Sequence, residues 1–220
     1  MSLPKPRAIL FDWDNTLVDT WPLIHEALNM TLRHMEHPEW SFAKVRGEVK
    51  KSMRDAFPGL FGERWEVAAE HYQNSYRSIH LERLTALADA EATLRAIPRS
   101  EIFVGLVSNK KGDALRKELT HLGWDHLVDI AIGAGDAATD KPTAAPVLLA
   151  LQGTTLKPGP DMWFVGDTGI DLETAKNTGC TAILYGDHVT DAGSFEGFPF
   201  TVHARDHVAL AAIITEAMRG

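Results

Sequence analysis

Residues 8–20 read AILFDWDNTLVDT, and they mark the start of a buried strand. Four apolar residues run directly into two aspartates, Asp12 and Asp14, with one residue between them. A short apolar run bounded by polar turn residues is typical of a strand in a parallel sheet, and its end would deliver Asp12 to the sheet's edge. Taken alone, an Asp-rich turn explains Asp12, Asp14 and Thr16 as well as a catalytic site does.

The composition indicates a globular protein with a sizeable core. The chain has 220 residues, of which 45% are hydrophobic and 24% charged. It exceeds the usual domain of about 100 to 150 residues, so we expect one large domain or one domain with an insertion. A single cysteine, Cys180, excludes an internal disulfide framework. No apolar run has the length of a signal peptide or membrane helix, which favours a cytoplasmic protein without a membrane partner.

The net charge helps to distinguish a nucleic-acid partner from a small-molecule partner. A formal net charge of -8 argues against a nucleic-acid partner, which would favour a basic face. The ten histidines show no spacing typical of a zinc site. The sequence therefore favours a small-molecule partner, and it leaves open whether the protein is a monomer or a homodimer.

The segment of residues 18–87 reads as helices only. Apolar residues at helical spacing predict helices over about 21–35, 41–57 and 65–79. Ser41 is the expected cap of the second helix, and Pro58 with Gly59 is expected to end it.

The remainder of the chain alternates between strands and helices. Alternation of this kind favours a Rossmann-like α/β fold, a parallel sheet covered on both faces. We predict an α/β core domain of residues 1–17 and 88–220, with an inserted small helical domain of residues 18–87. The strands expected after the first are 102–107, 128–132, 162–165 and 181–185. The helices expected in this part are 89–97, 113–122, 143–151, 172–176 and about 206–218, and Gly186–Gly197 is expected to be a loop.

Polar side chains follow the expected strands at the carboxyl ends, where ligands bind in such sheets. Carboxylates from different strand ends, together with a substrate phosphate, suit Mg²⁺, which prefers hard oxygen ligands. A hydroxyl and a lysine beside them complete a set suited to moving a phosphoryl group. The groups are Asp12, Asp14, Ser108, Asn109, Lys141, Asp167 and Asp171.

Four motifs stand in order along the chain: FDWDNT, VSNK, DKP and VGDTGID. The set resembles the haloacid dehalogenase superfamily, and closely its subfamily with a helical cap, which includes phosphoglycolate phosphatases and β-phosphoglucomutases. The resemblance covers nearly the whole chain. It implies that residues 18–87 form the cap, and that the protein is a magnesium-dependent phosphatase, a phosphoric monoester hydrolase acting on a small phosphorylated metabolite.

The resemblance also implies a division of work between the two aspartates. Asp12 would be the nucleophile that forms an aspartyl-phosphate. Asp14 would protonate the leaving oxygen and then activate the hydrolytic water. The division is physically sensible, because a metal-bound carboxylate stays ionised, whereas a carboxyl group held near other negative charge has a raised pKa and can carry a proton.

The other motifs would bind phosphate and metal. By the same resemblance, Ser108 and the backbone at Asn109 hold the phosphoryl oxygens, and Lys141 offsets negative charge and orients the nucleophile. The ligands of Mg²⁺ would be the side chain of Asp12, the backbone carbonyl of Asp14 and the side chain of Asp167. Asp171 would support this set.

The chain departs from the family pattern in its first motif. Asn15 replaces the usual glycine, and asparagine tolerates the positive φ that the turn would need. Trp13 is unusually bulky between the aspartates and is expected to press on the core or the cap. Arg46 and Lys50 are candidates to bind the substrate's own polar or acidic group, although a solvated helix face is the favoured explanation for both.

Three alternative functions remain open from the sequence. A β-phosphoglucomutase-like phosphomutase would carry the same four motifs. A phosphonate hydrolase would need a Schiff-base lysine, for which Lys44, Lys50 and Lys51 are available. A phospho-aspartate receiver or binding module would use a similar acidic cluster, but the spacing of Asp12 and Asp14 and the helical insertion favour turnover.

Overall fold

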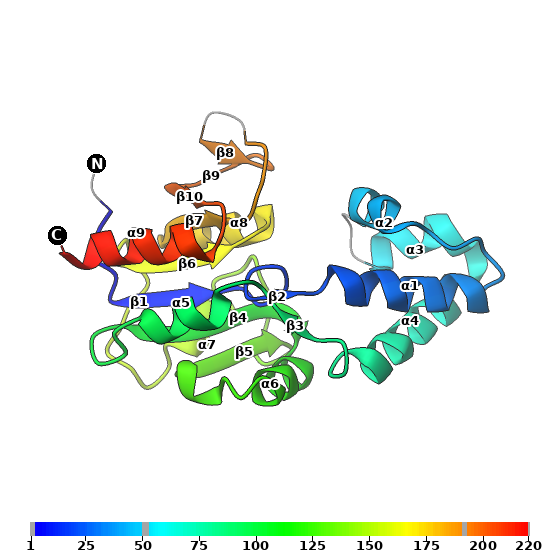
Figure 1. The fold of residues 1–220 in the computed structure, drawn as a ribbon, viewed down its shortest axis with the longest axis horizontal. Helices are drawn as coiled ribbons and strands as arrows, with labels where there is room; N and C mark the ends of the chain where they lie inside the picture. The colour runs from blue at the N-terminus through cyan, green and yellow to red at the C-terminus, as the bar shows by residue number, and fades with distance from the viewer. Residues whose placement is uncertain (1–2, 50–52, 191–192, 220) are drawn as a thin grey trace. The chain divides into compact units, whose positions relative to one another are not determined.

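The computed structural model describes residues 3–49, 53–190 and 193–219 (Figure 1). The chain divides into two compact units, one of Met1–Val18 with Ala86–Gly220 and one of Asp19–Thr85. The two connections between the units pair as β2 (Val18–Asp19) and β3 (Thr85–Ala86). Among the helices described, none has the length and apolar character needed to cross a membrane.

A six-stranded parallel sheet forms the centre of the larger unit, in the order β10-β7-β6-β1-β4-β5. All four residues of β1 (Ala8–Phe11) are buried, because the strand lies between β4 and β6 and both faces of the sheet are covered. The Rossmann-like α/β fold predicted from the sequence is confirmed. The other strands are β4 (Phe103–Lys111), β5 (Ile130–Ala134), β6 (Met162–Gly166), β7 (Thr181–Tyr185) and β10 (Val202–Ala204).

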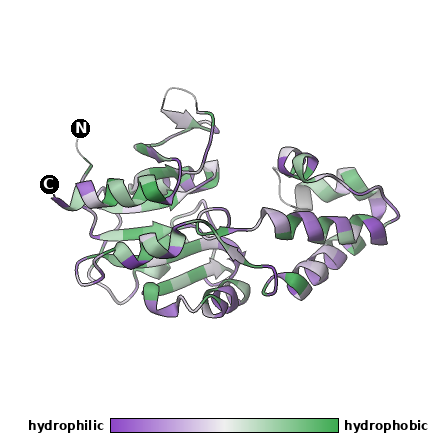
Figure 2. Cartoon of the chain, viewed as in Figure 1, coloured by the Kyte–Doolittle hydropathy of each residue, from purple (hydrophilic) through white to green (hydrophobic). Residues whose placement is uncertain are grey.

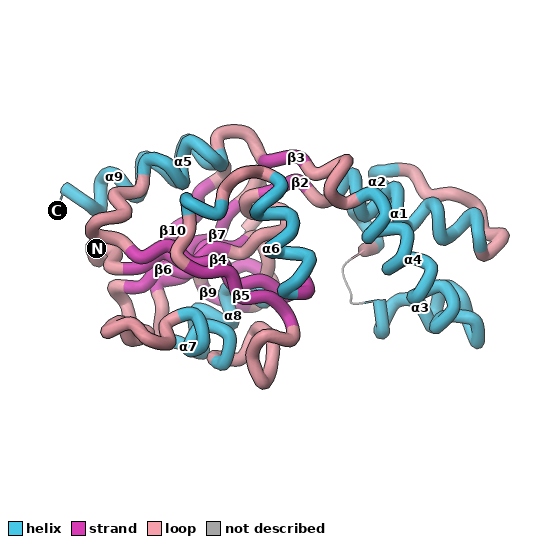
Figure 3. Tube along the Cα trace, turned by 90° about the horizontal axis from the view of Figure 1, so that it is seen from below, coloured by secondary structure: helices cyan, strands magenta, loops and turns pink. Residues whose placement is uncertain are grey.

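Helices cover the sheet on both sides (Figure 3). Helices α5 (Ala90–Ala96) and α9 (His207–Arg219) lie on one face, and α7 (Ala145–Ala150) and α8 (Gly169–Thr178) lie on the other. Helix α6 (Gly112–His121) packs beside β4 and β5 and is followed by a short 3-10 turn, η2 (Asp125–Leu127). The strands are predominantly hydrophobic (Figure 2), as burial on both faces requires.

Several sequence expectations for this unit were wrong in detail. Strand β4 continues to Lys111, so Ser108 and Asn109 lie within the strand and not after it. The expected loop 186–197 holds strand β8 (Ser194–Phe195), which pairs with β9 (Phe198–Pro199). Strand β10 was not foreseen. Strands of two or three residues are too short to show a periodic pattern, and pairing with a neighbour defines them.

Between β2 and β3, the regular elements described in the smaller unit are all helices, and they enclose a core of their own. Its elements are α1 (Trp21–His34), α2 (Phe42–Glu48), α3 (Met53–Phe61), η1 (Gly62–Arg64) and α4 (Trp65–Ile79). The capping role of Ser41 is confirmed, since its side chain accepts a hydrogen bond from the Lys44 backbone N–H.

The predicted single helix over 41–57 was wrong. Helix α2 ends at Glu48, because Val49 leaves the helical conformation at φ -81° and ψ 76°. Pro58 lies inside α3 and does not end it. The turn after Pro58 persists because Phe57 and Phe61 are both buried in the core of this unit, with ring centroids 5.0 Å apart. Tertiary packing therefore outweighs the hydrogen bond that proline removes.

Helix α9 begins at a buried histidine. His207 is fully buried, its ring centroid lies 4.7 Å from that of Tyr185, and its Nε2–H donates to the Thr16 carbonyl at 2.9 Å. Its Nδ1 has no hydrogen-bond partner among the described residues. Burial lowers the pKa of His207, because the charged form would lose its hydration.

We expect His207→Gln to destabilise the protein by about 1 to 2 kcal/mol at pH 8, through lost packing and a weaker hydrogen bond. The deficit should shrink below about pH 6.5. There the unfolded histidine binds a proton that the folded one does not, so the wild type loses stability as pH falls. Urea unfolding at pH 8, 7, 6 and 5 measures this. A deficit that is constant with pH would show that His207 is not held neutral.

Candidate active site

The first motif turns sharply at the carboxyl end of β1. The Asp12 backbone N–H donates to the Val165 carbonyl at 2.9 Å and continues the pairing with β6. Asn15 adopts φ 56°, which confirms the positive φ expected at this position, and its N–H donates to the Val18 carbonyl at 2.7 Å. The turn places Asp12 and Asp14 at the same edge of the sheet.

Lys141 joins two carboxylates from different elements. Its Nζ donates to Asp12 Oδ1 at 2.7 Å and to Asp171 Oδ1 at 2.6 Å. All three side chains are buried. Burial alone would lower the pKa of Lys141, but the two carboxylates outweigh it and raise that pKa. The lysine is therefore held charged beside the end of β1.

Three carboxylates form an acidic triad here. One oxygen from each of Asp12, Asp167 and Asp171 lies within 4.8 Å of the others, a grouping that could hold a metal ion. Desolvation raises the pKa of Asp167 well above its usual range, and the charges of Asp171 and Asp12 raise it further. Desolvation likewise raises the pKa of Asp171. A divalent cation would relieve this concentration of negative charge.

The three carboxylates of the triad differ in their hydrogen-bond partners. Both oxygens of Asp171 already accept from protein donors, Oδ1 from Lys141 and Oδ2 from the Thr168 backbone N–H at 3.0 Å and its hydroxyl at 2.7 Å. Asp167 accepts a single hydrogen bond among those described, from the Thr16 hydroxyl at 3.2 Å. Asp12 and Asp167 are therefore better placed than Asp171 to ligate a cation directly.

The second motif lies at the end of β4. Ser108 is buried, and its hydroxyl accepts from the Lys110 backbone N–H at 3.3 Å. The side chain of Asn109 donates to the Lys141 carbonyl at 3.1 Å and accepts from the Lys141 N–H at 3.0 Å. Asn109 thus ties the loop that carries Lys141 to the strand that carries Ser108.

The carboxylate of Asp14 lies apart from the triad's hydrogen bonds. Its Oδ1 accepts from Lys110 Nζ at 2.7 Å, and the same ammonium donates to Glu118 Oε2 at 2.6 Å. Desolvation raises the pKa of Asp14, Lys110 acts against that shift, and the charge of Asp12 adds to it. A carboxyl group with a raised pKa is suited to carrying a proton.

The sequence reasoning missed Lys110 and Glu118 as parts of this site. Lys110 stood within the quoted motif VSNK, and Glu118 interrupts the apolar positions Leu115, Leu119 and Leu122 of the expected helix. The position of Glu118 beside an apolar stripe was the one sign in the sequence that this charged residue is buried. The pairing of Lys110 with Asp14 could not be predicted, because the two residues are far apart in the sequence.

The two candidate substrate-binding residues, Arg46 and Lys50, belong to the smaller unit. Arg46 is exposed, and its guanidinium lies 5.5 Å from the centroid of the Trp21 ring, within the same unit. Lys50 lies outside the described residues.

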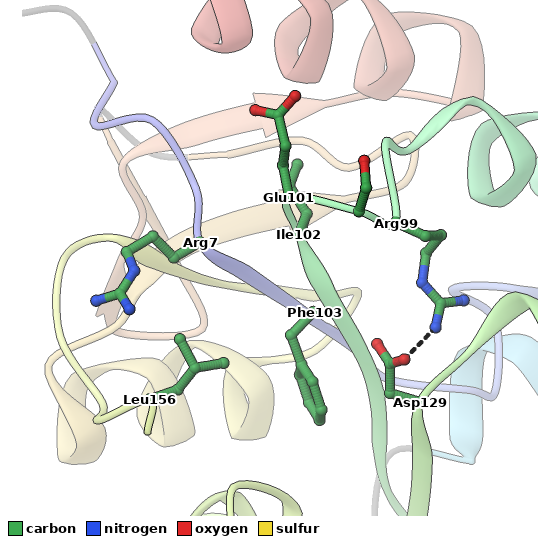
Figure 4. Close-up of a pocket in the computed structure, with 8 residues that line it drawn as sticks. Arg7, Arg99, Glu101, Ile102, Phe103, Asp129 and Leu156 are labelled. Carbon is green, nitrogen blue, oxygen red and sulfur yellow. Dashed lines mark hydrogen bonds and ion pairs between the residues drawn. The ribbon is translucent and has the colours of Figure 1, made fainter. Parts of the chain in front are cut away.

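A separate hollow lies at the opposite, amino ends of β1 and β4 and holds about 260 Å³ (Figure 4). Its arginines are already paired, Arg99 with Asp129 and Arg7 with Asp161. It contains none of the motif residues, so it is not the candidate active site. Its lining is Arg7, Arg99, Ser100, Glu101, Ile102, Phe103, Asp129 and Leu156.

Two bacterial proteins are similar in sequence to this chain over most of its length. A phosphoglycolate phosphatase of Yersinia pestis is 28% identical over 185 residues, covering 80% of this chain and 79% of that protein. Pyrophosphatase PpaX of Bacillus velezensis is 28% identical over 179 residues, covering 81% of this chain and 82% of that protein.

Solved structures agree on the fold. A haloacid dehalogenase-like hydrolase from Streptococcus pneumoniae superposes with a TM-score of 0.82 at 21% identity, covering 94% of this chain and 98% of that one. A hydrolase of the same superfamily from Ehrlichia chaffeensis gives 0.67 at 27% identity, covering 99% and 100%. The sequence profile of the haloacid dehalogenase-like hydrolases matches residues 9–185. The chain therefore belongs to the haloacid dehalogenase-like hydrolase family.

Proposed function

We propose that this protein is a magnesium-dependent phosphatase that hydrolyses a small phosphorylated metabolite through an aspartyl-phosphate on Asp12. One observation carries the proposal. Asp12 is held by Lys141 within an acidic triad, and the next motif aspartate, Asp14, is held separately by a different lysine. Two carboxylates in two environments suit a nucleophile and an acid/base group.

In the first step, a carboxylate oxygen of Asp12 attacks phosphorus while the bond to the leaving oxygen breaks. Asp14 gives its proton to that oxygen. In the second step, Asp14 takes a proton from water as the water oxygen attacks phosphorus, and the bond to Asp12 breaks. The enzyme returns to its starting protonation state, with alcohol and phosphate released.

The remaining residues bind and neutralise the phosphoryl group. Ser108 and the backbone at Asn109 donate to its oxygens, and Lys141 offsets the charge that accumulates beside Asp12. Mg²⁺ would be held by Asp12, Asp167 and the backbone carbonyl of Asp14, where it supplies positive charge to the transferring phosphoryl group. Asp171 supports this set through Lys141.

The relatives suggest which substrates to test first. Their names include phosphoglycolate phosphatase and pyrophosphatase, so 2-phosphoglycolate and pyrophosphate head the panel. The unit of residues 19–85 is the cap in this proposal, and its side chains select the substrate. Conversion of a hexose 1-phosphate to the 6-phosphate, with no release of phosphate, would contradict a hydrolase and favour a phosphomutase.

We expect Asp12→Asn to lower magnesium-dependent hydrolysis of 2-phosphoglycolate and p-nitrophenyl phosphate by roughly 10³-fold or more, because the amide cannot form the phosphoenzyme. Acid-quenched mass spectrometry should find phosphate on Asp12 in the wild type alone. Asp161→Asn, a partly buried carboxylate at the amino end of β6, is the matched control and should keep full activity. Full activity in Asp12→Asn would contradict the nucleophile assignment.

Metal binding can be measured without turnover. At a Mg²⁺ concentration about 100 times the dissociation constant, we expect the wild type to gain about 2.7 kcal/mol in free energy of unfolding. Asp167→Asn should lose most of that gain. In the presence of a chelator the same variant should be more stable than the wild type, because a desolvated carboxylate has left a cluster of like charges.

Thermal unfolding with and without Mg²⁺ tests both halves of this expectation. Asp161→Asn should respond to Mg²⁺ as the wild type does. An Asp167→Asn protein with the wild-type Mg²⁺ response would remove Asp167 from the metal site.

A further inference from the structure

Lys110 occupies a buried position between two carboxylates. It lies near the end of β4, and its side chain is 7% exposed. Its Nζ is 2.7 Å from Asp14 Oδ1 and 2.6 Å from Glu118 Oε2. Holding the long Lys110 side chain in one conformation costs conformational entropy, and burying its charge costs hydration free energy. Its fixed position between two carboxylates therefore indicates a specific role.

Glu118 is more deeply buried than the lysine that it pairs with. Its side chain is fully buried in the middle of α6. The same Oε2 that accepts from Lys110 also accepts from Trp13 Nε1 at 2.6 Å. The Trp13 ring packs edge-on against Trp124, with centroids 6.0 Å apart. Trp13 lies between Asp12 and Asp14 in the sequence. The hydrogen bonds that run from Asp14 through Lys110 and Glu118 therefore lead back to the first motif.

The arrangement repeats the one around the nucleophile. Lys141 joins Asp12 to Asp171 of α8, as Lys110 joins Asp14 to Glu118 of α6. In each case a buried lysine links one motif aspartate to a fully or nearly fully buried carboxylate on a helix. Each motif aspartate thus has its own orienting lysine.

We propose that Lys110, fixed by Glu118 and Trp13, is a positioning residue that holds Asp14 in the orientation for proton transfer. This inference rests on the acid/base role proposed above for Asp14. Asp14 has a side chain 31% exposed, and without Lys110 it could turn to solvent. With Oδ1 held by the ammonium, Oδ2 carries the proton to the leaving oxygen and receives the proton of the hydrolytic water.

A pair of substrates that differ in leaving group tests the inference. Phenyl phosphate needs its leaving oxygen protonated, whereas p-nitrophenyl phosphate releases a stabilised anion that does not. We expect Lys110→Met to lower kcat/KM for phenyl phosphate by about 100-fold, the usual contribution of general acid catalysis. For p-nitrophenyl phosphate the loss should be no more than about fivefold, because kcat/KM reports the first phosphoryl transfer.

The double variant separates positioning from a structural role. In an Asp14→Asn background, Lys110→Met should cause less than about a twofold further loss on phenyl phosphate, because residues acting through one group are not additive. Equal losses on both substrates, or a full additional loss in the Asp14→Asn background, would overturn the inference.

The Asp14→Asn variant alone tests the underlying function. If it affects both substrates equally, the acid/base assignment fails, and this inference fails with it. If it selectively impairs phenyl phosphate hydrolysis while Lys110→Met does not, only the positioning role fails.

Two further variants keep the test decisive. Lys110→Met alone leaves Glu118 as a buried, uncompensated carboxylate, so Lys110→Met/Glu118→Gln removes both charges and should show the same selectivity if the single variant does not fold. Lys117→Met removes an exposed lysine next to Glu118 on α6 and should leave kcat/KM unchanged for both substrates.

Discussion

The ion pairs of Lys141 with Asp12 and Asp171 are the interaction on which the site depends. Three carboxylates converge at one edge of the sheet, and the Lys141 ammonium donates directly to two of them. Such a cluster would be strongly destabilising without compensation, because buried like charges repel and lose their hydration. The site therefore holds a concentration of negative charge that a bound cation would relieve. The sheet supplies the stability that the cluster lacks.

That stability comes from the position of β1. The strand lies in register between β4 and β6, with all its side chains buried, so the backbone that carries Asp12 is held on both sides. Trp13 extends this support past the end of the strand. It is fully buried against Trp124 and hydrogen-bonded to Glu118, which explains why a bulky residue is accommodated between the two motif aspartates. The same residues therefore contribute to core packing and to the geometry of the candidate site.

The two motif aspartates are two residues apart and yet lie in different environments. Asp12 is buried, accepts a hydrogen bond from Lys141 and belongs to the triad that could hold a cation. Asp14 is more exposed, is bonded to Lys110, and has a raised pKa. Strand alternation would point residues 12 and 14 to the same side, so the difference arises from the turn that follows β1, in which Asn15 has a φ of 56°. Asp12 is then linked through Lys141 to α8, and Asp14 is linked through Lys110 to α6.

Local pattern was enough to predict the parallel sheet, the placement of Asp12 and Asp167 directly after their strands and the positive φ of Asn15, because each shows in a short stretch of sequence. It could not predict the end of α2 at Glu48, the persistence of α3 past Pro58, or strand β10, because tertiary contacts decide these. The pairing of Glu118 and Lys110 with Asp14 was equally hidden. By itself the sequence determined which chemical groups reach one edge of the sheet. Which lysine holds which aspartate was decided only by the packing of α6 and α8, since a carboxylate can pair with any cation that the fold brings within reach.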